Sequence, residues 1–364
     1  MPNTVLTPSI IAKEAIMVLQ NNMVFAGLVH RDFSNEFAKV GDTITVRKPA
    51  TFTANEYNGS SINVQDATEG SVAVKMDKIV DVSFAAGSKE LALSIQDFSS
   101  QFIQPAMRAH AQYLDALLAS LYTDIPYFAS VGGTPSMQDW ANVDMVMNQN
   151  KVPTDSRNIV IDPMTKSKYV ALPEIIHASK SGSTDALRKA CVGDDLMGLS
   201  AYMDQNIKNV IPGTVTAGNA TGTLGNSTVA LASVVPTTGT LNKGDLITID
   251  GNQYVVTANA VAAAGSIAAL AIYPALLTSP AGSVATYSAK TRHNLAFHHN
   301  AFALVSRPLE RPMGAAFADS ISFNGISCRI VAGYDMQAKK DTISIDFLCG
   351  VKTLTPELAC RFEG

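Results

Sequence analysis

Charged residues are scarce in this sequence. Only 16 % of the 364 residues are Asp, Glu, Lys or Arg, against about 25 % in typical globular proteins. Hydrophobic residues make up 47 %, so disorder over the whole length is excluded, because disordered chains combine low hydrophobicity with high charge. The formal net charge of −4 argues against a dedicated nucleic-acid binder, whose surface is usually strongly basic. The length suggests about two or three domains at roughly 150 residues each.

Long apolar runs and paired cysteines are also missing. No stretch reaches the roughly 18 apolar residues of a membrane-spanning helix, and Met1 to Ile11 lacks the basic and apolar regions of a signal peptide. The cysteines form no CxxC pair and lie outside zinc-ligand spacing of any histidine, so we expect free thiols in a reducing cytoplasm. They are Cys191, Cys328, Cys349 and Cys360.

Catalytic and cofactor-binding motifs are absent as well. The sequence has no P-loop, dinucleotide fingerprint, HExxH or GxSxG. His293, His298 and His299 cluster, but their spacing is poor for a shared metal in a helix and places the last two on opposite faces of a strand. We therefore expect no cofactor, no metal and no enzymatic activity. An enzyme whose site is assembled from residues distant in sequence remains an alternative.

A polar segment flanked by two strand patterns follows a short predicted helix, Ile10 to Leu19. Thr43–Arg47 alternates as a strand, and apolar positions alternate again from Val72 to Phe84. Asn58-Gly59 between them is typical of a turn. Residues 42–86 therefore predict a long β-arm with a hydrophilic tip. Such a tip cannot be buried against its own domain, so it is either flexible or lies on another subunit.

The strongest helical pattern follows, with apolar residues every three to four positions from Ile95 to Tyr122. Pro105 lies inside this span and must either kink the helix or begin a new one. We expect a short helix before it and the main helix after it.

Residues 137–210 then alternate between helix and strand patterns, which indicates a compact mixed α/β region. Its predicted elements are helices at 139–148, 165–172 and 184–190 and a buried strand at 158–161, with Asp162-Pro163 as a turn and Trp140 in the core.

Composition shifts sharply from Gly213 to Ala289, where the only charged side chains are Lys243, Asp245 and Asp250. Within this segment, LITI, an Asp-Gly turn and QYVVT predict a hairpin. Short strands between turn residues indicate a small β-barrel or sandwich inserted into a host domain. Disordered low-complexity chain is the competing interpretation of such a composition. Further strand patterns close the sequence at 301–306, 322–334 and 342–348, with an interruption at Gly325.

This order of parts resembles the major capsid proteins of tailed phages, and in particular the branch that carries an inserted β-barrel. Thr43–Arg47 with the helix before it is similar to the N-terminal arm of that family, and the helix to Tyr122 is similar to its spine helix. Segment 241–251, LNKGDLITIDG, is similar to the hairpin of the inserted domain. The segments SCRIVAGY from Ser327 and FLCGVKTLTPEL from Phe347 resemble the last strands of the family.

The resemblance implies an α+β tailed-phage capsid fold with an N-arm, an extended β-loop, a long spine helix, and peripheral and axial domains. A small β-barrel domain would be inserted into it. The implied boundaries are 1–48 for the N-terminal arm, 49–86 for the extended loop, 87–136 for the spine helix and peripheral domain, 137–212 for the first part of the axial domain, 213–290 for the inserted β domain, 291–319 for the return of the axial domain and 320–364 for the peripheral strands.

The function implied by the resemblance is that of a major capsid protein. Copies of the chain would assemble as hexamers and pentamers into an icosahedral shell that packages double-stranded DNA. The protein would reside in the virion and would assemble in the cytoplasm of a bacterial host. A cellular nanocompartment shell protein of the same fold and a phage tail structural protein remain alternatives.

The implied partners are other copies of the chain, a scaffolding protein, the portal, non-specifically bound double-stranded DNA and an optional decoration protein, with no membrane. A separate scaffolding protein is expected because the arm begins close to Met1. We expect the arm tip to contact a neighbouring subunit. The residues of this predicted contact are Phe52, Asn55, Glu56, Tyr57 and Asn58.

Overall fold

The computed structural model of the chain describes residues 13–19, 23–31, 43–47, 52, 54–56, 64, 70–86, 99–129, 131, 134–182, 184–193, 195–288, 290–310, 312, 317–323, 325–336 and 340–362. Contacts divide the chain into two compact units. Unit 1 consists of Met1–Val18, Arg31–Met107 and Ala303–Leu354. Unit 2 consists of Leu19–His30, Arg108–Phe302 and Thr355–Gly364.

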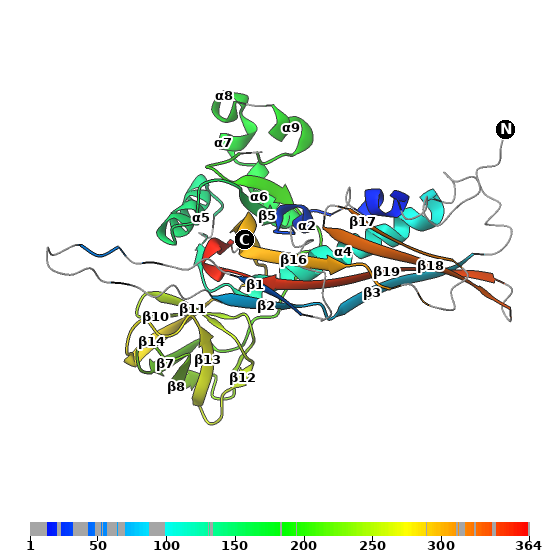
Figure 1. The fold of residues 1–364 in the computed structure, drawn as a ribbon. Coiled ribbons are helices and arrows are strands. Elements are labelled where there is room, and N and C mark those ends of the chain that lie inside the picture. The colour runs from blue at the N-terminus through cyan, green and yellow to red at the C-terminus, as the bar shows by residue number, and fades with distance from the viewer. Residues whose placement is uncertain are drawn as a thin grey trace. The chain divides into compact units, whose positions relative to one another are not determined.

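Unit 1 contains a long five-stranded sheet with the order β16-β19-β18-β17, in which β3 also pairs with β19 (Figure 1). Its central strand is β19, Lys340–Thr353, which runs antiparallel to both β18 and β3. Ile343, Ile345 and Phe347 alternate along β19 and are all buried, so one face of the sheet forms a core. The other strands are β3 (Lys78–Ala86), β16 (Phe302–Arg307), β17 (Phe317–Phe323) and β18 (Ile326–Asp335).

The interruption expected at Gly325 is a reversal of the chain. β17 and β18 pair antiparallel on either side of it, with Phe323 opposite Ile326. Gly325 has a φ of 75°, a conformation that glycine adopts without the strain of a side chain. A Cβ at this position would also lie 2.8 Å from the carbonyl oxygen of Arg31. The glycine is therefore required both by the turn and by the close approach.

The predicted single strand from Val72 to Phe84 is wrong. The structure has two strands here, β2 (Ser71–Lys75) and β3, separated by Met76 and Asp77. β2 pairs antiparallel with β1 (Thr43–Arg47), whose strand prediction is confirmed, whereas β3 leaves this pair and joins β19. Alternation of apolar residues predicts that a segment is extended, but it does not reveal that the two halves have different partner strands.

The base of the arm packs tightly on the rest of unit 1. Val74 and Met76 are buried in a cluster with residues of β16 and of the end of the long sheet. Gly350 on β19 lies so close to β2 that a Cβ there would be 2.3 Å from the carbonyl oxygen of Lys75. Only glycine permits this backbone approach. The cluster is completed by Ala303, Val305 and Leu354.

The long helical stretch begins where the sequence indicates. α4, Gln104–Ala119, has Pro105 as its second residue, where the missing N–H of proline does no harm. The prediction of a main helix after Pro105 is confirmed, although the last turns, Ser120–Asp124, are 3-10 rather than α-helical. Ser99–Ile103 before it form a π-helix, and the residues just before Ser99 lie outside the described residues. Residues 13–19 are helical as expected.

Unit 2 contains a second five-stranded sheet with the order β4-β20-β15-β5-β6. Every residue of β5, β15 and β20 is buried, including the polar side chains that these strands carry. The strands are β4 (Phe128–Ala129), β5 (Arg157–Ile161), β6 (Ser200–Met203), β15 (Asn294–His298) and β20 (Ala359–Phe362). The helices are α2 (Phe25–Leu28), α5 (Met137–Gln149), α6 (Pro163–Val170), α7 (Pro173–Ile176), α8 (Ala178–Ser181) and α9 (Asp185–Lys189).

Trp140 lies in the core of unit 2, as predicted. Its ring contacts Tyr169 edge-on at 5.9 Å between centroids and Phe362 at 5.8 Å. All three side chains are at most 1 % exposed. A set of three large aromatic rings joins α5, α6 and β20, so the C-terminal strand is an integral part of this core.

Asp162 does more than begin a turn, which corrects the simple turn prediction. Its carboxylate accepts hydrogen bonds from the backbone N–H groups of Met164 and Thr165, both at 3.1 Å, and so caps α6 at its N-terminus. Pro163 occupies the first helical position. Burial opposes the charged form, but the hydrogen bonds from Thr165 and the adjacent Arg292 guanidinium, 2.5 Å away, lower the pKa of Asp162.

A buried carboxylate on α4 binds the N-terminal segment of unit 2. Asp115 is 0 % exposed and accepts from the backbone N–H groups of Val24, Phe25 and Ala26 at 3.0, 3.0 and 3.4 Å. Burial raises the pKa of Asp115 to about 7, with a further contribution from the charge of Asp204, although the three N–H groups act in the opposite direction. The folded chain therefore holds a proton here that the unfolded chain would release near pH 4.

This site predicts a dependence of stability on pH. Because the folded pKa of Asp115 is raised, its contribution to stability is complete below about pH 4 and is lost as the pH rises to about 7. The loss is at most about 4 kcal/mol. In urea unfolding between pH 4 and pH 8, the free energy of unfolding should decline less for Asp115→Asn than for the wild type. If the free energy of unfolding falls equally steeply with pH in both proteins, Asp115 is not the group responsible.

The segment from Ala217 to Ser288 folds as a closed six-stranded barrel with the order β10-β11-β13-β8-β7-β14 (Figure 1). The predicted hairpin is confirmed: β10 and β11 pair across Asp250 and Gly251, both of which have positive φ. The barrel has its own apolar core. Its strands are β7 (Ala217–Thr221), β8 (Thr228–Val235), β10 (Leu246–Ile249), β11 (Asn252–Val256), β13 (Ile267–Tyr273) and β14 (Ala281–Ser288).

The host chain comes together where the barrel begins and ends. The backbone N–H of Val210 donates to the carbonyl oxygen of Thr291 at 2.7 Å, and these residues flank the barrel on its two sides in sequence. The barrel is thus an insertion whose entry and exit lie side by side in unit 2.

Candidate functional site

The predicted contact residues of the arm tip lie partly within the described residues. Phe52 is 65 % exposed, and Asn55 and Glu56 are also exposed. Tyr57 and Asn58 lie outside the described residues. An exposed phenylalanine among polar residues is typical of a contact surface, because aromatic side chains are enriched in interfaces. Contact of this segment with a neighbouring subunit stays a prediction.

The described residues offer little for catalysis or metal binding. Within them, no three His, Cys, Asp or Glu side chains come together in a way that could hold a metal. His293 stacks on Tyr122 with ring centroids 4.5 Å apart, so its ring packs in the fold. Burial raises the pKa of the Cys328 and Cys349 thiols to about 12, and neither is a reactive thiolate at neutral pH. None of the described helices is long and apolar enough to cross a membrane.

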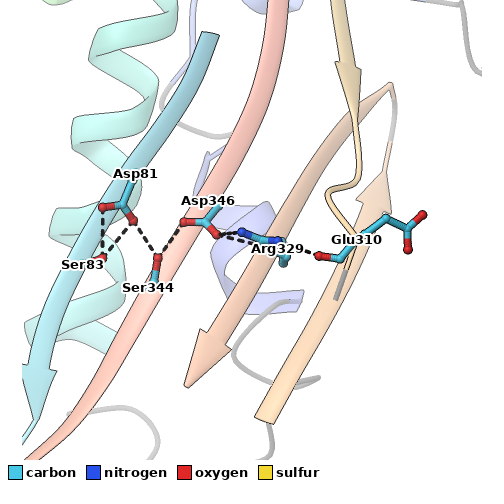
Figure 2. Close-up of polar contacts among 6 residues, drawn as sticks. All are labelled: Asp81, Ser83, Glu310, Arg329, Ser344 and Asp346. Carbon is cyan, nitrogen blue, oxygen red and sulfur yellow. Dashed lines mark hydrogen bonds and ion pairs between the residues drawn. The ribbon is translucent and has the colours of Figure 1, made fainter. Parts of the chain in front are cut away.

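A row of polar side chains crosses three strands of the unit 1 sheet (Figure 2). We call it the polar row; it consists of Asp81 and Ser83 on β3, Ser344 and Asp346 on β19, and Arg329 on β18. The register creates it, since Asp346 lies opposite Arg329 on one neighbouring strand and opposite Asp81 on the other. Side chains at directly opposite positions in antiparallel strands lie about 4.5–5.5 Å apart, so these groups interact.

The ion pair of Arg329 and Asp346 is the centre of the polar row. Arg329 Nε donates to Asp346 Oδ2 at 2.9 Å, and Nη2 contacts the same oxygen. The side chains are only 18 % and 9 % exposed, respectively, so solvent screens the attraction weakly. Arg329 Nη1 also donates to the carbonyl oxygen of Glu310 at 2.6 Å. The guanidinium thus joins β18 to β19 and to the segment after β16.

In the other half of the polar row, serine hydroxyls link two carboxylates. Ser344 Oγ lies 2.6 Å from Asp346 Oδ1 and 2.7 Å from Asp81 Oδ1, but its single proton can be donated to only one carboxylate at a time. Ser83 Oγ donates to Asp81 at 2.9 Å. The guanidinium of Arg329 bonds to Asp346, the hydroxyl of Ser344 lies between Asp346 and Asp81, and Asp81 lies at the exposed end. The polar row thus links the side chains of three strands and helps to fix their register.

A second polar arrangement in unit 2, the barrel dock, fixes the barrel to its host. The backbone of Phe128 bonds twice to the side-chain amide of Gln253, with N–H to Oε1 at 2.9 Å and Nε2 to the carbonyl oxygen at 3.0 Å. Tyr273 on β13 donates to Glu357 Oε1 at 2.9 Å. Gln253 and Tyr273 belong to the barrel, whereas Phe128 and Glu357 lie before and after it in the sequence. Host segments from both sides of the barrel in sequence therefore bond to it.

Arg361 is the buried centre of the barrel dock. It is 0 % exposed, its Nη1 donates to the carbonyl oxygen of Gly244 at 2.7 Å, and its guanidinium lies 5.1 Å from the centroid of the Tyr122 ring. The neighbouring ion pair between Lys243 and Asp124, at 3.6 Å, is largely solvated. The C-terminal strand of the host is thus bonded directly to the loop that precedes β10.

Sequence reasoning did not identify either polar arrangement. Arg329 and Asp346 each sit on the polar side of an alternating strand, where a charge is normally solvated. Only the register of β18 and β19 shows that they meet. For Arg361 a signal exists, because an arginine inside the apolar run Ala-Cys-Arg-Phe indicates a buried guanidinium that needs a partner.

Comparisons with known proteins address the fold. No protein-family model matches the sequence, and no curated protein matches it. A chain of Mycobacterium phage Che8 is 15 % identical with a TM-score of 0.55, and the match covers 93 % of this chain and 90 % of that chain. The capsid of the Cyanophage P-SCSP1u gives 14 % identity, coverage of 88 % and 83 %, and a TM-score of 0.46. A virus-like particle from Pyrococcus furiosus is 8 % identical, and the match covers 96 % of this chain and 97 % of that chain with a TM-score of 0.44.

The likeness to the phage Che8 chain extends over nearly the whole sequence and, at this identity, shows the fold alone. The chain has the α+β fold of tailed-phage capsid proteins, and its closed barrel is part of the structure. The predicted fold class is therefore confirmed. Membership of the branch with an inserted barrel and the seven domain boundaries stay predictions.

Proposed function

We propose that this chain is the major capsid protein of a tailed phage, a structural protein that assembles with its own copies into a closed shell. The observation that supports the proposal is the likeness in fold to a phage Che8 chain over 93 % of the sequence. The shell is icosahedral, built from hexamers and pentamers, and packages double-stranded DNA. No enzymatic activity is required for this role.

The composition is consistent with a shell that encloses DNA. A subunit with a net charge of −4 lacks the basic surface that gives proteins non-specific affinity for the DNA backbone. An inner wall of this kind lets the nucleic acid move in and out. In this proposal the chain meets DNA only non-specifically, and a scaffolding protein, a portal and an optional decoration protein are its other partners, during assembly in a bacterial cytoplasm.

The arm tip is the proposed contact with a neighbouring subunit. Its base is fixed by Val74, Met76 and the close approach at Gly350, whereas Phe52 is 65 % exposed. An anchored base, with an exposed phenylalanine beside its polar tip, suits a segment that lies on another copy. Permanent assemblies bury more than about 2,000 Å² per interface, and an arm laid over a neighbour is an economical way to reach that area.

Electron microscopy of the expressed protein, alone and with the genes adjacent to its own, tests the proposal. Wild-type chain is expected to form closed, uniform polyhedral particles. Removing residues 54–63 or replacing Phe52 with serine should lower the particle yield by about tenfold or more, because a contact worth over 1.4 kcal/mol is lost. Circular dichroism should show that both variants stay folded.

Leu224→Ser is the matched control, because Leu224 is a similarly exposed apolar residue, 62 % exposed, at a turn of the barrel. Its particle yield should stay close to that of the wild type. Normal shells from the arm variants would refute the contact of the arm with a neighbour. Helical tubes or small discrete oligomers under every condition would refute the shell itself.

A further inference from the structure

A cavity of about 610 Å³ lies at one end of unit 2, between α7, α8, α9 and the segment that follows α9. Much of its wall is apolar, and Ile175, Ala186 and Val192 in it are buried. Met197 lines the cavity and is 43 % exposed, so part of the apolar wall is accessible. The remaining apolar side chains are Met137 and Leu196.

The charged groups of the cavity are mostly acidic. Glu174 pairs with Lys180 at 3.5 Å, and Asp185 pairs with Lys189 at 3.3 Å. Asp195, which also lines the cavity, forms no ion pair with any described residue. A binding site for a small polar ligand usually contains a buried polar atom that lacks a partner within the protein. None of the charged lining groups is such an atom. The cavity therefore suits an apolar group accompanied by one cation.

The outer side of α9 carries an apolar side chain and a cation next to each other. Ala186 faces the cavity, and successive helical residues are turned by about 100°, so Leu187 and Arg188 point away from it. Leu187 is 71 % exposed, and Arg188 is exposed and forms no ion pair with a described residue. One side of the helix thus closes an apolar, acidic cavity, while the other side presents an apolar residue next to a cation.

We infer that α9 of one copy enters the cavity of the next copy, with Leu187 against the apolar wall and Arg188 paired with Asp195. This inference rests on the proposed shell, because it needs copies placed side by side. A contact between two different surfaces of the same chain, here the outer side of α9 and the cavity, is heterologous, and it produces a ring when the rotation between subunits closes. The complementary charges set the orientation of the contact and oppose wrong pairings.

A disulfide cross-link tests this contact directly, because Cys191 lines the cavity. In Leu187→Cys, the new thiol would lie in the neighbour's cavity beside Cys191, and a disulfide forms where their Cα atoms come within roughly 7 Å. Mild oxidation of assembled particles should give a ladder of covalent oligomers on a non-reducing gel. Adding Cys191→Ser should abolish the ladder. The other cysteines are buried and should not contribute.

Charge reversal supplies an independent measurement that does not depend on cross-linking. Arg188→Glu should lower the yield of particles by about tenfold or more, since it places two carboxylates together. Arg188→Glu with Asp195→Lys should recover most of that yield. Lys168→Glu, on an exposed position of α6, is the matched control and should leave the yield close to that of the wild type.

The outcomes separate this inference from the proposed function. Intact particles whose Leu187→Cys subunits run only as monomers, together with no recovery in the reversed pair, would overturn the contact and leave the shell in place. A small molecule found in the cavity of such particles would also overturn it. Absence of particles for the wild type under every condition would refute both proposals.

Discussion

Replacing Arg329 with methionine is expected to destabilise the sheet of unit 1 by about 3–5 kcal/mol. The substitution leaves the carboxylate of Asp346, only 9 % exposed, without its cation, and it also removes a donor from the carbonyl oxygen of Glu310. Hydrogen exchange of the β18 and β19 amides is the suitable measurement, because it reports locally. A chain with two compact units need not unfold in a single step.

The matched control for this prediction replaces both partners. Arg329→Met with Asp346→Leu removes the buried charge together with its counter-ion, so the stability should return to within about 1 kcal/mol of the wild type. Asp346→Asn alone should cost less than Arg329→Met, because the amide oxygen can still accept from the guanidinium, whose side chain is 18 % exposed and therefore partly solvated. If the single arginine variant exchanges no faster than the wild type, the ion pair contributes nothing to the sheet, and the role given to the polar row is wrong.

Arg361→Met is expected to loosen the barrel from its host by about 2 kcal/mol, because the charged hydrogen bond to the carbonyl oxygen of Gly244 is lost. The guanidinium is fully buried, and both of its named partners, Gly244 and Tyr122, lie outside β20. Hydrogen exchange should become faster at the Phe128 amide, which bonds to the barrel. The amides in the barrel core, such as Ile247, should keep their protection, since that core is separate.

The adjacent Lys243 provides the control for the barrel dock. Lys243→Ala removes an ion pair with Asp124 in which the lysine side chain is 50 % exposed, so the loss should be below about 1 kcal/mol. The two variants therefore compare a buried cation with a solvated one in the same region. Equal effects of the two substitutions, or loss of protection throughout the barrel core in Arg361→Met, would contradict this account of the dock.

Local signals in the sequence were sufficient where structure is decided locally. Pro105 marked the start of the main helix because proline is compatible with a first turn. Asp250-Gly251 marked the hairpin of the barrel because both residues adopt positive φ readily. The composition of segment 213–289, with its few charges, indicated a small β domain, and the structure has a closed barrel there.

Pairing between distant segments was the part that the sequence could not provide. Nothing in the alternation from Val72 to Phe84 distinguishes the half that pairs with β1 from the half that pairs with β19. The polar row could not be predicted for the same reason, because Arg329 and Asp81 each resemble solvated strand residues until the register is known. The predicted contact of the arm tip rests on the resemblance and on the polarity of the tip, and it stays a prediction.

The 2.7 Å hydrogen bond between Val210 and Thr291 has a meaning for the gene as well as for the fold. Because the chain leaves the host and returns at one point, the coding segment between these positions is a self-contained cassette. A single recombination event can add, remove or exchange it without altering the strands that flank it. Related genomes can then differ by a whole barrel while sharing the host, and an engineer can use the same junction to graft a foreign domain.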